Sequence, residues 1–93
     1  LKFKFKLPDL DSRRNLWRMY LRKEIPGSED IDVELLAQRY LFSGAQIAMV
    51  VQNACIEAIA RNGKSKRLYL QDLLKYADLE EPWTDKVNKS IGF

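Results

Sequence analysis

The chain has 93 residues, of which 46% are hydrophobic, and its formal net charge is +3. This length makes a single domain, and the apolar content excludes a disordered tail. The one cysteine, Cys55, excludes an internal disulfide, and the lack of any histidine removes the commonest general base and metal ligand, so no metal site is expected.

The first residues alternate lysine with apolar side chains from Lys2 to Leu7. This alternation is typical of a β-strand and differs from the continuous apolar stretch of a signal peptide. No second strand of similar quality follows, so residues 1–8 are expected to be an exit strand and hinge from a sheet located elsewhere. No stretch is apolar enough to span a membrane, and we expect a cytoplasmic protein.

A first helix is predicted over residues 10–23. Asp9 can cap its start, and Leu16, Met19 and Tyr20 share one of its faces. The proline and glycine at positions 26 and 27 end the helical segment, because proline stops helical hydrogen bonding and glycine accepts turn geometry.

Another face of this helix carries an arginine stripe, Arg14, Arg18 and Arg22, at four-residue spacing. Residues at this spacing lie above one another on a helix. A basic stripe is usually a solvated face, and the alternative is a contact with an adjacent subunit. The sequence therefore offers the three arginines as candidate contacts with a neighbouring subunit.

Two further helices have clear start signals. Asp32 is a good N-cap for a second helix, and Ser43 caps a third helix that begins at Gly44 and runs to about Asn62. Gly63 then suits the left-handed residue that commonly follows a helix.

The third helix is predicted to be central, because apolar residues cover most of its circumference. Its narrow polar face places Arg61 to pair with Glu57. A short helix over residues 71–79 follows, and Pro82 can sit in the first turn of a final helix over residues 83–90. The sequence thus predicts an all-α fold, a small four- to five-helix bundle with a short extended N-terminal segment.

No self-sufficient active site is found. The four glycines form neither GxxxxGK[ST] nor GxGxxG, the loops that cradle phosphates, so the chain alone is not expected to be an enzyme. The start of the third helix is distinctive, because Gly44 and Ala45 let a flat, acceptor-rich ligand approach the backbone and the positive end of the helix dipole. Taken alone, this pair more often indicates close helix packing.

The order of these features resembles the C-terminal helical lid domain of the AAA family of AAA+ ATPases. The resemblance covers about residues 3–79. It rests on the alternating strand and on motifs in the family's order: Pro8-Asp9, Arg13, Leu16 with Tyr20 one turn later, the run from Asp30 to Ala37, and Ser43-Gly44-Ala45 before a long alanine-rich helix.

The resemblance implies a nucleotide-binding role for four residues. Leu16 and Tyr20 are expected to border the adenine, and Gly44 and Ala45 to touch the base and ribose. The family's second-sensor arginine has no counterpart at positions 45–48, which fits the branch that lacks it. Two further departures lie on either side of the start of the helix: Leu41 replaces a usual glycine, and Gln46 replaces a usual acidic residue.

The resemblance also implies a larger parent protein. Residues 1–8 would leave the missing ATPase core, residues 9–80 would form the lid, and residues 81–93 a helical tail. The parent is expected to hydrolyse ATP as a ring, a hexamer, using ATP or ADP with Mg²⁺ and acting on a protein substrate. Its lid would rotate about the hinge and relay nucleotide state to neighbouring subunits. No nucleotide is expected to stay bound to this fragment, and neither a membrane nor nucleic acid is an expected partner.

A different class of function stays open. Residues 1–27 hold eight basic and three acidic side chains, whereas residues 28–93 hold eight and ten. A freestanding helical interaction module could use this basic first third to bind nucleic acid or an acidic protein partner. Salt-dependent oligonucleotide binding would support that alternative.

Overall fold

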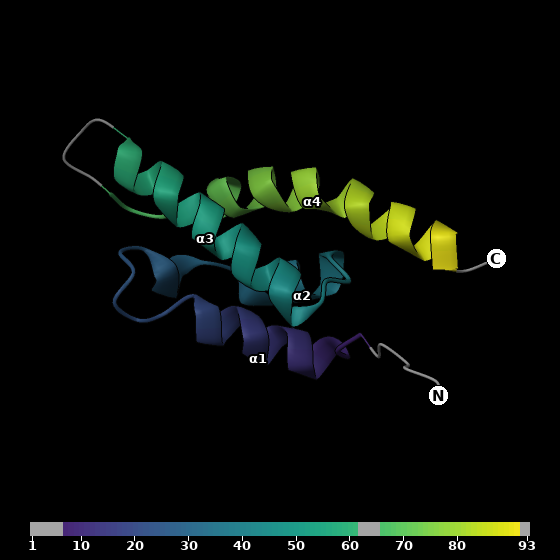
Figure 1. Ribbon diagram of the computed structural model, residues 1–93. Coiled ribbons are helices and arrows are strands. Elements are labelled where there is room, and N and C mark those ends of the chain that lie inside the picture. The colour runs from purple at the N-terminus through teal and green to yellow at the C-terminus, as the bar shows by residue number, and fades with distance from the viewer. Residues whose placement is uncertain (1–6, 62–65, 92–93) are drawn as a thin grey trace.

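The computed structural model describes residues 7–61 and 66–91, and for residues 82–91 it describes the backbone only. The described chain contains helices and no strand, which confirms the all-α prediction (Figure 1). The exit strand predicted within residues 1–8 falls almost wholly outside the described residues. The elements in chain order are α1 (Leu10–Tyr20), the 3₁₀ helix η1 (Ser28–Asp30), α2 (Val33–Arg39), α3 (Gly44–Ala60) and α4 (Leu70–Ile91).

Helix α1 starts where the sequence predicts and ends earlier. The Asp9 side chain accepts a hydrogen bond from the Ser12 amide at 2.8 Å. The helix ends at Tyr20 rather than at residue 23, because Leu21 leaves helical geometry with ψ of 69° and buries its side chain in the core. Tertiary packing therefore ends this helix before its local pattern does.

The turn after α1 requires glycine. Gly27 has a φ of +86°, and a Cβ atom built on it would lie 2.5 Å from the Leu68 carbonyl oxygen. The Leu68 amide donates to the Pro26 carbonyl at 2.8 Å, and the Ser28 hydroxyl donates to the Arg22 carbonyl at 2.8 Å. The first bond holds the turn against the segment that precedes α4, and the second closes the turn on itself.

The predicted caps of α2 and α3 are both present. The Asp32 side chain accepts from the Leu35 amide at 3.1 Å. At α3, the Ser43 hydroxyl accepts from the Gln46 amide at 3.3 Å, while the Gln46 side chain accepts from the Ser43 amide at 2.9 Å. This reciprocal pair is a capping box, which satisfies two amides that have no partner in the helix. The predicted closing Gly63 lies outside the described residues.

Helix α3 is the central element, as the sequence predicts. It packs against α1 on one side and α4 on the other, while α2 packs on α1 (Figure 1). Its buried side chains point into one core; Ile59, which the sequence assigns to the same apolar set, is 61% exposed. The largest fully buried side chains of the core are Trp17, Leu36, Tyr40, Phe42, Ile47, Val50, Leu68 and Leu73.

Helix α4 corrects the prediction of two separate C-terminal helices. It runs without a break from Leu70 to Ile91, with Pro82 inside it. A proline removes one backbone hydrogen bond and disturbs the preceding turn, but it does not by itself end a helix. Figure 1 shows the last turns of α4 continuing past the start of α3.

The ion pairs of α3 also differ from the prediction. Arg61 pairs with Asp72 of α4 at 2.8 Å rather than with Glu57. Glu57 accepts instead from Lys75, which also lies on α4. Glu57 of α3 and Arg61, the residue that follows the end of this helix, therefore both join it to α4.

Candidate functional site

Helix α1 and the start of α3 bring two of the four candidate residues together. A Cβ atom built on Gly44 would lie 3.7 Å from each of the two δ-methyl carbons of Leu16, which is ordinary van der Waals distance. Leu16 and Gly44 are both half-buried, and Ala45, the next residue along α3, is exposed. This edge is apolar, poor in side chains and open on the Ala45 side.

Tyr20 lies one turn after Leu16 on α1, so the two side chains share a face of that helix. Tyr20 is half-buried and packs partly against the core. The four predicted residues thus come from two helices that touch each other. Leu16 faces Gly44, and Tyr20 and Ala45 extend from this pair along their helices.

The capping box shapes the backbone at this edge. Gly44 and Ala45 occupy the first two positions of α3, where amides have no partner within the helix. The box engages the amides on either side of them, those of Ser43 and Gln46. The positive end of the α3 dipole is consequently at the Gly44-Ala45 edge, where it favours acceptor groups.

Residues that sequence analysis missed tie this edge to α4. The Tyr40 hydroxyl donates to the Asp78 carboxylate at 2.5 Å, and the Gln46 side-chain amide donates to Glu80 at 3.3 Å. Burial, followed by the hydrogen bond to Asp78, raises the pKa of Tyr40 above its ordinary value. No local sequence signal indicates these contacts, because the partners are more than thirty positions apart.

Arg13, which the sequence offers only as part of a motif, is a buried structural residue. Its Nε donates to the Ala37 carbonyl at 2.8 Å, and its Nη1 donates to the Pro8 carbonyl at 2.9 Å. The guanidinium therefore connects the segment before α1 to the last turn of α2. This contact fixes the position of Pro8, which the sequence assigns to the hinge.

The structure separates the three residues of the arginine stripe. Arg14 donates to both carboxylate oxygens of Glu34 and also to Asp11, at 2.6 Å. The hydrogen bond from Arg14, assisted by one from Gln38, lowers the pKa of Glu34 to about 2. Arg18 and Arg22 are exposed. Arg14 therefore serves the contact between α1 and α2, and only the other two present a fully open surface.

The described residues show neither a metal-binding cluster nor a membrane-spanning helix. Across residues 7–61 and 66–81, whose side chains the structure describes, no group of three or more acidic or cysteine side chains is placed to hold a metal ion. In the same part of the chain, no helix combines the length and apolar character that crossing a membrane requires.

Among the known proteins that the chain resembles are two of stated function. The chain is 33% identical over 95 residues to the katanin p60 ATPase-containing subunit A1 of Strongylocentrotus purpuratus, which covers 92% of this chain. It is 41% identical over 73 residues to the ATP-dependent zinc metalloprotease FtsH of Parabacteroides distasonis, which covers 77% of it. No family model matches the chain. No solved structure matches it significantly either.

Both relatives are AAA+ ATPases, and the chain belongs to the AAA+ ATPase family. It spans 18% of the length of the katanin subunit and 10% of the length of FtsH. The similarity thus falls on a small part of each relative.

Proposed function

We propose that this chain is the lid of an AAA-family ATPase, and that it covers the adenine side of bound ATP or ADP. The observation that carries the proposal is the contact between Leu16 of α1 and Gly44 of α3, with the exposed Ala45 beside it. A purine needs an apolar, flat-sided edge with room beside the backbone. These residues supply both features. Adenine nucleotide is the proposed ligand because the related proteins are an ATPase subunit and an ATP-dependent protease.

The residues of this edge fit an adenine and not the phosphates. Leu16 and Tyr20 offer an apolar face and an aromatic ring against which a purine can pack. The Gly44-Ala45 backbone leaves space for the base and ribose. The chain has no phosphate-binding loop, so the triphosphate and its Mg²⁺ would be held by the ATPase core of the parent protein. Bound ATP supplies the phosphoanhydride that such a core hydrolyses.

The lid would relay nucleotide state through the contacts around this edge. Gln46 joins the start of α3 to Glu80, and Tyr40 joins the preceding segment to Asp78. Arg13 of α1 joins the segment at Pro8 to the same set of contacts through its hydrogen bond to the Pro8 carbonyl. A displacement of the edge would therefore move α1, α3 and α4 as one body, which is the behaviour that hinge rotation requires. In the proposed parent, a cytoplasmic hexameric ring acting on a protein substrate, this rotation would reach the next subunit, and the exposed Arg18 and Arg22 are available to meet it.

The test uses the parent protein and two substitutions, Tyr20→Ala and Ala45→Asp. Loss of a stacking ring is expected to weaken ADP binding about tenfold. The Ala45→Asp substitution would add bulk and a negative charge at the edge, and a loss of similar size is expected. Titration with a fluorescent ADP analogue measures both dissociation constants.

A matched control is Ile56→Ala, three turns along α3 from Ala45 and 57% exposed. Its ADP affinity should equal that of the parent. Because Ala45 is exposed, the Ala45→Asp variant keeps its fold and tests the site directly. If it binds ADP as tightly as the unsubstituted protein does, the chain does not cover the adenine.

A further inference from the structure

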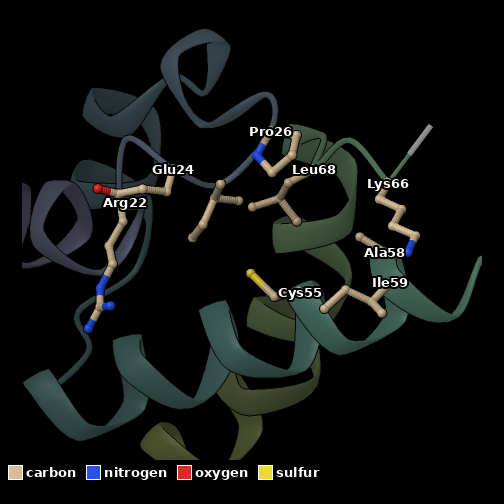
Figure 2. Close-up of a pocket in the computed structure, with 9 residues that line it drawn as sticks. Arg22, Glu24, Pro26, Cys55, Ala58, Ile59, Lys66 and Leu68 are labelled. Carbon is tan, nitrogen blue, oxygen red and sulfur yellow. The ribbon is translucent and has the colours of Figure 1, made fainter.

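The opposite end of α3 borders an apolar hollow. The hollow has a volume of about 480 Å³ and lies between α3, the segment at Ile25 and Pro26, and Leu68 (Figure 2). Figure 2 shows the Cys55 sulfur pointing from α3 into this space, toward Leu68 and the segment that carries Pro26. Gly44 and Cys55 are eleven positions apart, so the hollow is about 16 Å along the helix from the nucleotide edge.

Small side chains and a fixed turn create this hollow. Cys55 and Ala58 leave space on the surface of α3 that larger residues would fill. The opposite wall is held in place by the hydrogen bond from the Leu68 amide to the Pro26 carbonyl and by the left-handed turn at Gly27. Ile59 stands at the edge of the hollow and is 61% exposed. The hollow is therefore a preformed apolar surface.

Positive charge brackets the hollow. Arg22 and Lys66 lie on opposite sides of it, and both are exposed (Figure 2). In the part of the chain that the structure describes, neither side chain takes part in an ion pair. Glu24 is the only carboxylate among the described residues that line the hollow. The lining thus combines an apolar floor with a basic rim.

We propose that this hollow docks an acidic segment of a protein partner, which inserts an apolar side chain against Cys55, Ile59 and Leu68 and faces its carboxylates toward Arg22 and Lys66. An apolar anchor in a desolvated pocket supplies most of the affinity of such contacts, and the charged rim supplies orientation and association rate. The site is independent of the nucleotide edge and does not depend on the proposed lid function.

The same observations disfavour nucleic acid as the occupant. None of the described residues that line the hollow is aromatic, so unpaired bases would find no ring to stack on. A phosphate backbone would also gain little from an apolar floor and would use only the two rim cations. An acidic peptide with one apolar side chain matches both parts of the surface.

Protection of the single cysteine tests the proposal on the unmodified chain. Burial raises the pKa of the Cys55 thiol, so alkylation by iodoacetamide is followed at constant alkaline pH by mass spectrometry. The probe is a short synthetic peptide with a leucine-phenylalanine pair flanked by glutamates. At saturation this peptide should slow alkylation about tenfold, because an occupied site withholds the thiol.

Two matched probes decide what occupies the hollow. A peptide with lysines in place of the glutamates should give no protection, and added salt should weaken protection by the acidic peptide. Equal protection by both peptides, or no protection by either, overturns the proposal. Protection by a single-stranded oligonucleotide and not by the acidic peptide overturns it in favour of a nucleic-acid site.

Substitutions at the rim provide a second measurement. Lys66→Glu and Arg22→Glu should each weaken peptide binding about fivefold, measured by fluorescence anisotropy. Ile59→Asp should abolish it. The control is Leu79→Asp on α4, where Leu79 is 63% exposed and lies outside the lining of the hollow. If the control weakens binding as much as Ile59→Asp does, or if Ile59→Asp binds normally, the hollow is not the docking site.

Discussion

At the scale of single residues, Arg13 shows how one buried cation can be satisfied without a carboxylate. Its guanidinium donates to the carbonyls of Ala37 and Pro8. Ala37 lies in the last turn of α2, where carbonyls have no partner within the helix and where the dipole favours positive charge. The residue therefore completes the end of one helix and fixes the approach to another.

Gly27 gives a residue-scale prediction about stability. Gly27→Ala should lower the free energy of unfolding by about 2 kcal/mol, because the position has a left-handed backbone. An added Cβ atom would also meet the Leu68 carbonyl oxygen. Urea denaturation measures the change.

The matched control is Gly44→Ala, where the new Cβ atom would meet only Leu16, at 3.7 Å. Its free energy of unfolding should stay within about 0.5 kcal/mol of that of the unsubstituted chain. Equal stability of the two variants would contradict the account of the turn at Gly27.

Glu34 gives a prediction about pH. Its pKa is lowered from 4.5 to about 2 in the folded chain by the hydrogen bond from Arg14. A lowered folded-state pKa means that the contribution to stability is full above about pH 4.5 and is lost as the pH falls through about 2. Glu34→Gln should therefore lower the free energy of unfolding at pH 6. Near pH 2, where Glu34 takes up its proton in the folded chain, the substitution should leave the free energy of unfolding unchanged.

Denaturation curves of both proteins across this pH range measure the effect. The control is Glu29→Gln at pH 6, since Glu29 is exposed and the variant should be as stable as the unsubstituted chain. If the Glu34→Gln variant and the unsubstituted chain differ in stability by the same amount down to about pH 2, the Arg14 contact does not depend on the charge of Glu34.

At the scale of elements, the starts of the helices could be predicted and their ends could not. Asp9, Asp32 and Ser43 all cap helices as the sequence indicates, because a cap depends on residues within one turn. The early end of α1 and the continuity of α4 through Pro82 depend on packing between distant segments. A local pattern carries no information about either.

Contacts between elements likewise could not be predicted from local sequence patterns. The predicted partner of Arg61 was wrong, because Asp72 approaches from α4 and no pattern within α3 reveals it. Leu16 and Gly44 lie against each other, an arrangement that the family resemblance implies and that spacing alone cannot indicate, because a resemblance carries tertiary information. Whether Leu16, Tyr20, Gly44 and Ala45 bind nucleotide stays a prediction.

The tie between Tyr40 and α4 supports an element-scale prediction. Tyr40→Phe should keep the ring, its stacking on Phe42 at 5.0 Å and the fold. It should lower the free energy of unfolding by about 1.5 kcal/mol, as expected for a hydrogen bond to a charged group. Thermal and urea denaturation measure this change.

The partner substitution provides the check for this contact. Asp78→Asn in the Tyr40→Phe background should add little further loss, because the two side chains share one interaction and the second partner of Asp78, Arg39, forms only an exposed ion pair with it. Fully additive losses would show that the hydroxyl and the carboxylate act independently.

At the scale of the whole molecule, the chain presents one edge of the proposed nucleotide site. A single edge supplies too little contact to overcome the entropy lost on association. The isolated chain should therefore hydrolyse no ATP and bind ADP with a Kd weaker than about 1 mM. An NMR titration of the chain with ADP, together with a phosphate-release assay, measures both properties. Tight binding by the chain alone would contradict its assignment as one half of a shared site.

The hollow beside Cys55 has a thermodynamic consequence for the molecule. A globular chain normally fills a space of this kind, since close packing of apolar atoms favours the native state. Leucine in place of the half-buried Cys55 would extend the apolar packing toward Leu68, so the small side chain at this position leaves apolar surface uncovered. The apolar side chain of the proposed partner would cover this surface in the complex.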